Sequence, residues 1–252
     1  MPSPTFLPAL VLALAAALPA SGARAQTAPG PAARPATAAD TAPAAPDDAG
    51  MARRMQACVV CHGREGRATN AGYFPRIAGK PEGYLFNQLV NFRDGRRRNP
   101  AMNHLMRHMS DDYLRDIARY FAGLDLPYPP ARAHGLDDAQ SALARRLVFE
   151  GIPARGLPAC AACHGARMAG RLPAMPGLLT LPSDYLVGQL GAWRTGLRHA
   201  MAPDCMGEIA RRLSADEASA VARWLSAQTL PPGTGPEADA ARNLPLDCGS
   251  GR

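Results

Sequence analysis

The 252-residue sequence lacks an apolar run of the length that spans a lipid bilayer. Residues 6–18 form an apolar segment that is too short, and Ala23-Arg24-Ala25 follows it as a small-x-small site of the kind that signal peptidases cleave. We therefore expect residues 1–25 to be a signal peptide that is cleaved near Ala25 and directs the protein to the periplasm. An uncleaved membrane anchor is the alternative, and for the mature chain we expect at most peripheral membrane contact.

Large apolar side chains are missing from residues 26–50, which are almost entirely Ala, Pro, Thr, Asp and Gly. Such a segment cannot bury enough apolar surface to offset the entropy cost of ordering the chain, so we expect a disordered tether.

A nucleic-acid-binding motif is missing as well. The chain carries 28 basic and 21 acidic residues, a net charge of +7, but its arginines are scattered along the sequence. We therefore expect no nucleic-acid partner. The positive field instead favours docking on acidic protein or membrane surfaces.

Strand-like alternation is missing, and apolar positions recur at helical spacing instead. This pattern predicts helices around residues 84–92, 114–121, 139–149, 185–193 and 217–225. Ser110 and Ser214 are each followed by acidic residues and are expected to be N-caps. We expect an all-α fold, interrupted near residues 126–130 by a proline-rich linker that a helix cannot cross.

The sequence does contain one unit twice. Cys-Val-Val-Cys-His-Gly at 58–63 recurs as Cys-Ala-Ala-Cys-His-Gly at 160–165. Eleven later positions match at a constant offset of 101, and Met102 matches Met206 at an offset of 104. The repeat predicts two tandem domains, which we place at residues 51–130 and 131–230, followed by a tail at 231–252.

Cys-x-x-Cys-His is the attachment sequence for covalent haem, because two thiols on one helical turn add to the porphyrin vinyl groups and the adjacent histidine binds the iron. A thioredoxin-like site would need a preceding strand and a single copy, and a zinc site would need a second ligand pair about 15 to 20 residues away. Neither pattern is present. We expect two haem c groups, held by Cys58, Cys61, His62, Cys160, Cys163 and His164.

The sixth iron ligand is expected on a downstream loop and is usually methionine in a cytochrome c. Met102 and Met206 occupy equivalent positions and are our candidates. Met201 is close enough in sequence to reach the same iron as Met206. His104 and His108 could replace Met102 in a bis-histidine site.

Three further features leave alternatives open. Pro75 and Pro176 follow their histidines by 13 and 12 residues and could offer carbonyls that hold the second ring nitrogens, or they are ordinary loop prolines. Cys205 and Cys248 could form a disulfide that ties the tail over the loop of Met206. They could also remain free thiols or bridge two molecules.

These residues resemble the dihaem cytochromes c of the cytochrome c4 family over about residues 50–230. The similarity rests on both Cys-x-x-Cys-His-Gly motifs, on Phe-Pro-Arg-Ile-Ala-Gly at 74–79, on Tyr-Leu-x-x-Gln-Leu-x-x-Phe-Arg-x-Gly-x-Arg at 84–97 and on Asn-Pro-x-Met at 99–102. The chain departs from the family in its tether, its tail, Cys205 and Ala200-Met201-Ala202.

The resemblance implies two class I cytochrome c domains packed in pseudo-twofold fashion, each with a His/Met-ligated haem. It also implies a periplasmic carrier between a quinol-oxidising complex and a terminal oxidase. Carried onto this sequence, the thioether bonds fall on Cys58, Cys61, Cys160 and Cys163, and the axial ligands on His62, Met102, His164 and Met206.

We expect electron transfer without any bond-making chemistry of the protein's own. A dihaem peroxidase-like enzyme would need an iron with an open sixth position, and the matched methionines argue against it. The remaining alternative is a cytochrome subunit fixed in a dehydrogenase or oxidase complex, which the sequence does not distinguish from a free carrier.

Overall fold

The computed structural model describes residues 48–69, 73–131, 133, 135–230, 233–238 and 244–251. The expected signal peptide at 1–25 and most of the expected tether at 26–50 lie outside the described residues. Residues 45–252 form one compact unit. Within the described part of the chain, no helix is both long and apolar enough to cross a membrane.

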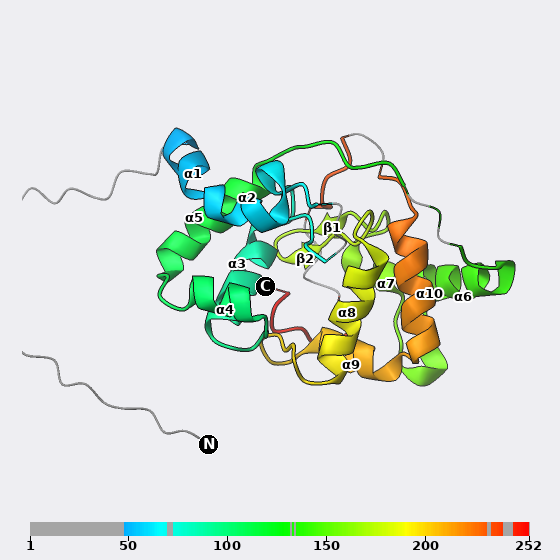
Figure 1. Cartoon of the computed structure of the whole chain (residues 1–252). Coiled ribbons are helices and arrows are strands. Elements are labelled where there is room, and N and C mark those ends of the chain that lie inside the picture. Colours follow the sequence, from blue (N-terminus) through cyan, green and yellow to red (C-terminus); the bar gives the residue numbers. More distant parts are fainter. Residues whose placement is uncertain are drawn as a thin grey trace, which may run out of the picture. The chain divides into compact units, whose positions relative to one another are not determined.

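The first repeat is helical (Figure 1). Its elements are α1 (Asp48–Arg54), α2 (Gln56–His62), the 3-10 helix η1 (Arg64–Gly66), α3 (Glu82–Arg93), α4 (Pro100–Met106) and α5 (Asp111–Ala122). Helix α3 packs against α5 and α4. Their apolar faces bury a single cluster made of Met51, Met55, Leu85, Phe92, Met106, Leu114, Ile117, Ala118 and Phe121.

Helix α1 begins at Asp48, close to the expected end of the tether at about Gly50. Met51 and Met55 are only 3% and 2% exposed and belong to the apolar cluster. Their burial offsets the cost of ordering the polar residues before them.

The second repeat has the same helical plan with one addition. Its elements are α6 (Asp138–Phe149), the 3-10 helix η2 (Pro153–Arg155), α7 (Cys160–His164), α8 (Ser183–Arg194), α9 (Cys205–Arg212) and α10 (Ala215–Ser226). The addition is a hairpin of two short antiparallel strands, β1 (Gly170–Arg171) and β2 (Met175–Pro176), which the sequence analysis did not predict. Helix α10 packs against α6 and α8 over a second cluster that draws its residues from 143–230.

The five helices predicted from apolar spacing are confirmed as α3, α5, α6, α8 and α10. Both predicted N-caps are confirmed too: the Ser110 side chain accepts a hydrogen bond from Tyr113 N, and the Ser214 side chain accepts one from Glu217 N. The fold is therefore all-α apart from the small hairpin.

The linker between the repeats is held by a buried arginine. Arg76 donates to the carbonyl oxygens of Leu126 and Pro127 at 2.6 and 3.0 Å, and its guanidinium lies 4.1 Å from the ring centroid of Tyr128. The proline-rich segment, which has few N–H groups of its own, thus follows a fixed path along the first repeat.

Candidate functional site

Helices α2 and α7 carry the two Cys-x-x-Cys-His motifs. In each helix the two cysteines are three residues apart, so their thiols lie on one face, and the histidine is the last helical residue. Cys58, Cys61, Cys160 and Cys163 are free and partly exposed. None of the four is used in a disulfide, so all four thiols remain for covalent attachment of a group.

A glycine with positive φ ends each of these helices. The angles are 77° at Gly63 and 88° at Gly165. A Cβ at position 63 would lie 2.2 Å from the carbonyl oxygen of Ala68, so no larger residue fits there without a backbone shift. These glycines let the chain turn sharply straight after the histidine.

Both motif histidines are oriented in the same way. His62 Nδ1 lies 2.9 Å from the carbonyl oxygen of Pro75, and His164 Nδ1 lies 2.8 Å from that of Pro176. Since a carbonyl can only accept, each Nδ1 carries the proton and each Nε2 keeps a lone pair for a metal. Burial lowers the pKa of both rings, which keeps them neutral as metal binding requires. The predicted role of the two proline carbonyls is confirmed.

The motif thiols do not have the properties of a redox-active dithiol. Burial raises the pKa of Cys58 and Cys163, and it raises that of Cys160 to about 11. Disulfide oxidoreductases depend on a lowered thiol pKa. Among the described residues, moreover, no three or more His, Cys, Asp or Glu side chains cluster as a zinc site would need.

The two candidate methionines lie in the first turns of short helices. Asn99 caps α4 and accepts a hydrogen bond from Met102 N at 3.1 Å, and the Met102 side chain packs on the same apolar cluster as Cys58. Met206 is the second residue of α9, which Asp204 caps, and it is half-buried. Each capped turn fixes the backbone that carries its methionine.

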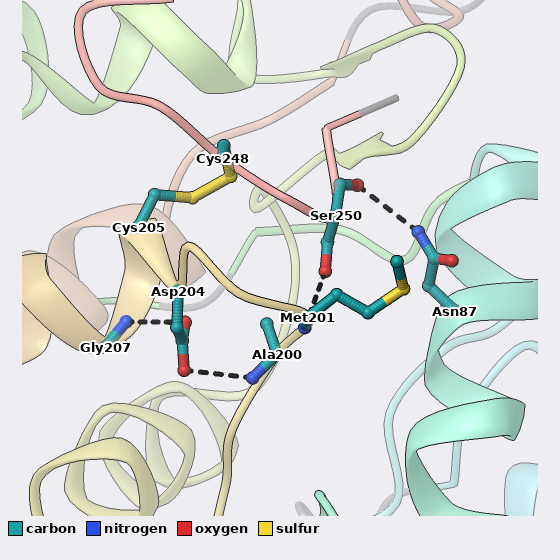
Figure 2. The surroundings of a disulfide bond; sticks show 8 residues. All are labelled: Asn87, Ala200, Met201, Asp204, Cys205, Gly207, Cys248 and Ser250. Carbon is teal, nitrogen blue, oxygen red and sulfur yellow. Dashed lines mark hydrogen bonds between the residues drawn. A yellow bond between two sulfur atoms is a disulfide. The ribbon is translucent and has the colours of Figure 1, made fainter.

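The alternative ligands are placed less favourably. Met201 is 43% exposed, and its side chain extends toward Asn87 of α3 (Figure 2). His104 and His108 are both exposed. A ligand that shields an iron from water is expected to be buried, so these positions favour Met206 over Met201 and Met102 over the histidine pair.

Cys205 and Cys248 form a disulfide with a Cα–Cα distance of 5.1 Å, which decides between the alternatives left open by the sequence (Figure 2). The chain beyond it is bonded on both sides. Gly249 N donates to the Pro203 carbonyl at 2.9 Å, and Ser250 O accepts from Asn87 Nδ2 at 3.2 Å. The tail is thus tied to the residue next to Met206, as expected, and it also reaches the first repeat.

An earlier part of the tail pairs with the hairpin that follows α7. Glu237 N donates to the Gly170 carbonyl, and the Glu237 carbonyl accepts from Leu172 N, both at 2.9 Å. The Glu237 carboxylate lies 3.8 Å from Arg171 Nε. Strand β2 of the hairpin contains Pro176, whose carbonyl holds His164 Nδ1, so the tail supports the segment that orients the histidine. No sequence signal marked this contact, because residues 231–252 show no periodic pattern.

A buried polar network joins the two repeats. Arg97 donates to Tyr185 Oη at 3.0 Å and to Gln189 Oε1 at 2.6 Å, and Arg198 donates to Gln88 Oε1 at 2.9 Å. Each arginine thus reaches the glutamine of the other repeat. This interface was not predicted from the sequence, although all five residues are positions at which the two repeats match.

The two arginines of this network bury positive charge. Arg97 and Arg198 are 8% and 5% exposed, and neither forms an ion pair with a carboxylate among the described residues. Burial and the neighbouring Arg97 lower the pKa of Arg198 to about 10. Buried cations without an anionic partner are costly, so the network fits an added group that carries carboxylates.

The complete donor set fits haem c at both motifs. Paired thiols would form the thioether bonds, neutral histidine Nε2 and methionine sulfur are the axial ligands that such haems take, and the two buried guanidinium groups suit haem propionates. The contact with Phe74, whose ring centroid lies 6.2 Å from that of His62, adds an apolar wall at the first motif.

No protein-family model matches the chain. The chain is similar to curated relatives of two kinds. One, from Stutzerimonas stutzeri strain A1501, is named a thiosulfate dehydrogenase electron acceptor; it is 38% identical over 68% of this chain and 78% of its own length. The other, a cytochrome c4 of Pseudomonas aeruginosa, is 32% identical over 72% of this chain and 89% of its own length.

Solved structures show the same two likenesses. Reduced cytochrome c4 from Pseudomonas stutzeri matches with a TM-score of 0.63 and 28% identity, covering 73% of this chain and 99% of that one. A thiosulfate dehydrogenase from Marichromatium purpuratum matches with a TM-score of 0.60 and 36% identity. The match covers 67% of this chain but only 36% of the dehydrogenase chain, so it does not extend to the whole enzyme.

Proposed function

Because the chain belongs to the cytochrome c4 family of dihaem c-type cytochromes, we propose that it is the electron acceptor of an exported thiosulfate dehydrogenase. Members of this family carry two covalently bound haem c groups, and this chain is an electron-carrying cytochrome of the same kind. What the proposal adds is the identity of the donor.

The proposed donor rests on the name of one relative, an electron acceptor of thiosulfate dehydrogenase. This chain is 38% identical to that relative but 32% identical to the cytochrome c4 of P. aeruginosa. The structural likeness to about a third of a thiosulfate dehydrogenase chain supports it, because a unit like this one occurs within such an enzyme. The net charge of +7 favours docking on an acidic surface of the donor.

We assign the chain's own residues as follows. Cys58 and Cys61, and likewise Cys160 and Cys163, attach the two haems, and His62 and His164 bind iron through Nε2 while Nδ1 stays bonded to the proline carbonyls. The thioethers of Met102 and Met206 fill the sixth positions. When bound, each haem supplies an iron that cycles between ferric and ferrous by one electron.

The axial ligands and the surrounding protein set the reduction potential of each haem. Methionine sulfur favours ferrous iron and raises the reduction potential, and the two apolar clusters pack against Cys58 of α2 and against Cys160 and Ala161 of α7. Ligation by both methionines would leave neither iron open to a substrate. We therefore infer that the chain performs no bond-making step, and that the dehydrogenase does the oxidation.

We infer a periplasmic location from the expected signal peptide at residues 1–25, and a terminal oxidase as the final acceptor. The second candidate for the donor is a quinol-oxidising complex, which the resemblance to cytochrome c4 favours. Either donor would pass single electrons to the haems, so the chain would need the same haem ligands for both.

Rapid mixing distinguishes the donors. The oxidised two-haem protein is mixed with S. stutzeri thiosulfate dehydrogenase and thiosulfate, or with a quinol-oxidising complex and quinol, and haem reduction is followed by absorbance. We expect faster reduction by the dehydrogenase, with a rate that falls as salt is added. Reduction by the quinol-oxidising complex alone would contradict the proposed donor and leave the electron carrier intact.

A further inference from the structure

Lys80 is the only lysine among the 28 basic residues of the chain. It belongs to the first repeat, yet its Nζ donates a hydrogen bond to the carbonyl oxygen of Gly177, in the second repeat, at 2.8 Å. The residue is only 4% exposed. The 27 other basic residues are arginines. The single lysine side chain is thus buried, and its ammonium group contacts the other repeat.

The charge of Lys80 is not neutralised by the residues around it. Its hydrogen-bond acceptor is a neutral carbonyl, and no carboxylate forms an ion pair with it among the described residues. The charged group that acts on it from its own segment is Arg76, and burial together with Arg76 lowers the pKa of Lys80 to about 7. An apolar side chain of similar size would avoid this cost, so stability does not explain the lysine.

The position of Lys80 connects it to the histidine of the second motif. Gly177 directly follows Pro176, whose carbonyl accepts the hydrogen bond from His164 Nδ1. The positive charge of Lys80 acts on the His164 ring, where it contributes to the lowered pKa of that ring. Arg171, on the same hairpin, is engaged by Glu237 and by the Ala162 carbonyl.

The first repeat provides the comparison. At the offset of 101 that aligns the repeats, the counterpart of Lys80 is Leu181, an apolar core residue. His62 is instead acted on by Arg97, whose guanidinium does not lose its proton at accessible pH. Among the described residues, therefore, the cation near the second motif can lose its proton near neutral pH, whereas the cation near the first motif cannot.

We propose that Lys80 is a positioning and tuning residue for the second site: its ammonium, contributed by the first repeat, raises the reduction potential of the haem attached at Cys160 and Cys163. A positive charge beside the axial histidine stabilises the added electron and hence the ferrous state. Reduction by one electron draws part of a proton from solvent onto Lys80 Nζ, because the two gains favour each other. This inference rests on the haem attachment proposed above.

The test is a redox titration of the two-haem protein at pH 6 and pH 8.5, with spectra recorded at each potential. In the unmodified protein, the midpoint potential of the second haem is lower at pH 8.5 than at pH 6, while that of the first haem is the same at both. In Lys80→Met the second midpoint is low at both values, and in Lys80→Arg it is high at both. We expect about a tenfold change in the equilibrium for reducing the second haem, which is 59 mV for a one-electron couple.

Two controls make the result decisive. A Met102→His variant moves only the first midpoint and so assigns the two waves. A haem count of two per chain shows that the site is loaded, so a change in attachment is not mistaken for a failure of tuning. If Lys80→Met does not fold, the comparison of Lys80→Arg with the unmodified protein at pH 8.5 still decides. Equal midpoints in those two, or equal shifts of both haems, would overturn the proposal.

The single lysine also allows a direct measurement. Protein labelled with ¹³C-lysine gives one side-chain resonance, and its chemical shift follows the protonation of Lys80 in the reduced and oxidised forms. We expect a titration near pH 7 that lies at higher pH in the reduced form. A resonance that titrates near its ordinary value in both forms would contradict the proposed coupling.

Discussion

The two motif histidines are oriented by the same bond but lie in different surroundings. His164 is 6% exposed and is flanked by the β1–β2 hairpin, by Glu237 of the tail and by Lys80 from the other repeat. His62 is half-buried, and around it the described residues include neither a hairpin nor a contact from the tail. Duplication has thus kept the ligand geometry, while parts of the chain outside the second repeat have come to support the second site.

The two motif sites should therefore depend to different degrees on distant parts of the chain. The first site is built largely from its own repeat, whereas the second depends on the tail, a disulfide and a side chain of the first repeat. Changes in those distant parts should therefore affect the second haem more than the first, and the experiments below measure how far the two sites separate.

Removing the attachment cysteines has the largest expected effect. Cys58→Ser with Cys61→Ser should lower the haem count from two to one per chain, and Cys160→Ser with Cys163→Ser should do the same for the other site. Intact mass and a pyridine haemochrome assay measure this. Loss of both haems from either pair of changes would show that the two repeats do not bind haem independently.

Exchange of the candidate axial methionines should have the next largest effect. Met102→Leu and Met206→Leu should each remove about half of the ferric absorption band that arises from methionine–iron bonds, and each should open one iron to carbon monoxide. Met201→Leu is the matched control, since its side chain is exposed and extends toward Asn87. A band unchanged in Met206→Leu and halved in Met201→Leu would move the second ligand to position 201.

The disulfide provides a test at the level of stability. Cys205→Ser with Cys248→Ser opens a link between residues 43 positions apart. Chain entropy predicts a loss between about 3 and 4.7 kcal/mol, the values for loops of about 15 and 100 residues. Both tryptophans, Trp193 and Trp224, lie in the second repeat, so denaturant unfolding followed by their fluorescence reports on that half.

The same disulfide variant tests how the two sites differ. Because the tail is bonded to Pro203 and Asn87 beside the α9 turn, we expect its release to weaken the methionine–iron band of the second haem and to leave the first unchanged. Equal losses at both haems would mean that the tail stabilises the whole unit rather than one site.

Burial of Lys80 predicts a pH dependence of stability. Its pKa falls from 10.5 to about 7 on folding, so between these values the unfolded chain binds more protons than the folded one. The free energy of unfolding should therefore rise with pH from about 7 to 10.5, by up to about 1.4 kcal/mol per pH unit. Below about pH 7 both states hold the proton, so Lys80 should cause no pH dependence there. Urea midpoints at pH 6, 7.5 and 9 measure it. Parallel curves for the unmodified protein and Lys80→Met would contradict it.

The sequence predicts the parts of the molecule that depend on short-range patterns. Apolar spacing located α3, α5, α6, α8 and α10, serine followed by acids located two caps, and the repeat located the motif residues and the Pro75 and Pro176 carbonyls. Each of these features can be predicted from residues close together in the sequence or from comparison of the two repeats.

Contacts between distant segments were not predictable in this way. The hydrogen bond from Lys80 to Gly177 joins residues 97 positions apart, and the pairing of Glu237 with the β1–β2 hairpin involves a tail without periodicity. Such contacts are set by tertiary packing, which single-sequence patterns do not encode. The second site contains most of them, which is why it was the less predictable of the two.

The helix caps give the smallest expected difference between the repeats. At α10 the bonding is reciprocal: Ser214 Oγ accepts from Glu217 N at 3.1 Å, and Glu217 Oε2 accepts from Ser214 N at 2.8 Å. Glu217 also pairs with Arg155, which lowers the pKa of its carboxyl. At α5 the described cap is the single bond from Tyr113 N to Ser110 Oγ, at 3.3 Å.

Ser214→Ala should therefore cost about 1 to 2 kcal/mol and Ser110→Ala about 0.5 to 1 kcal/mol of unfolding free energy, measured by denaturant titration of each variant against the unmodified protein. Replacing Ser214 removes the acceptor of Glu217 N, while the backbone N–H at position 214 and Arg155 still bind the Glu217 carboxylate. Equal losses would mean that the reciprocal cap adds nothing beyond a single capping bond, and that the second repeat is reinforced only by its long-range contacts.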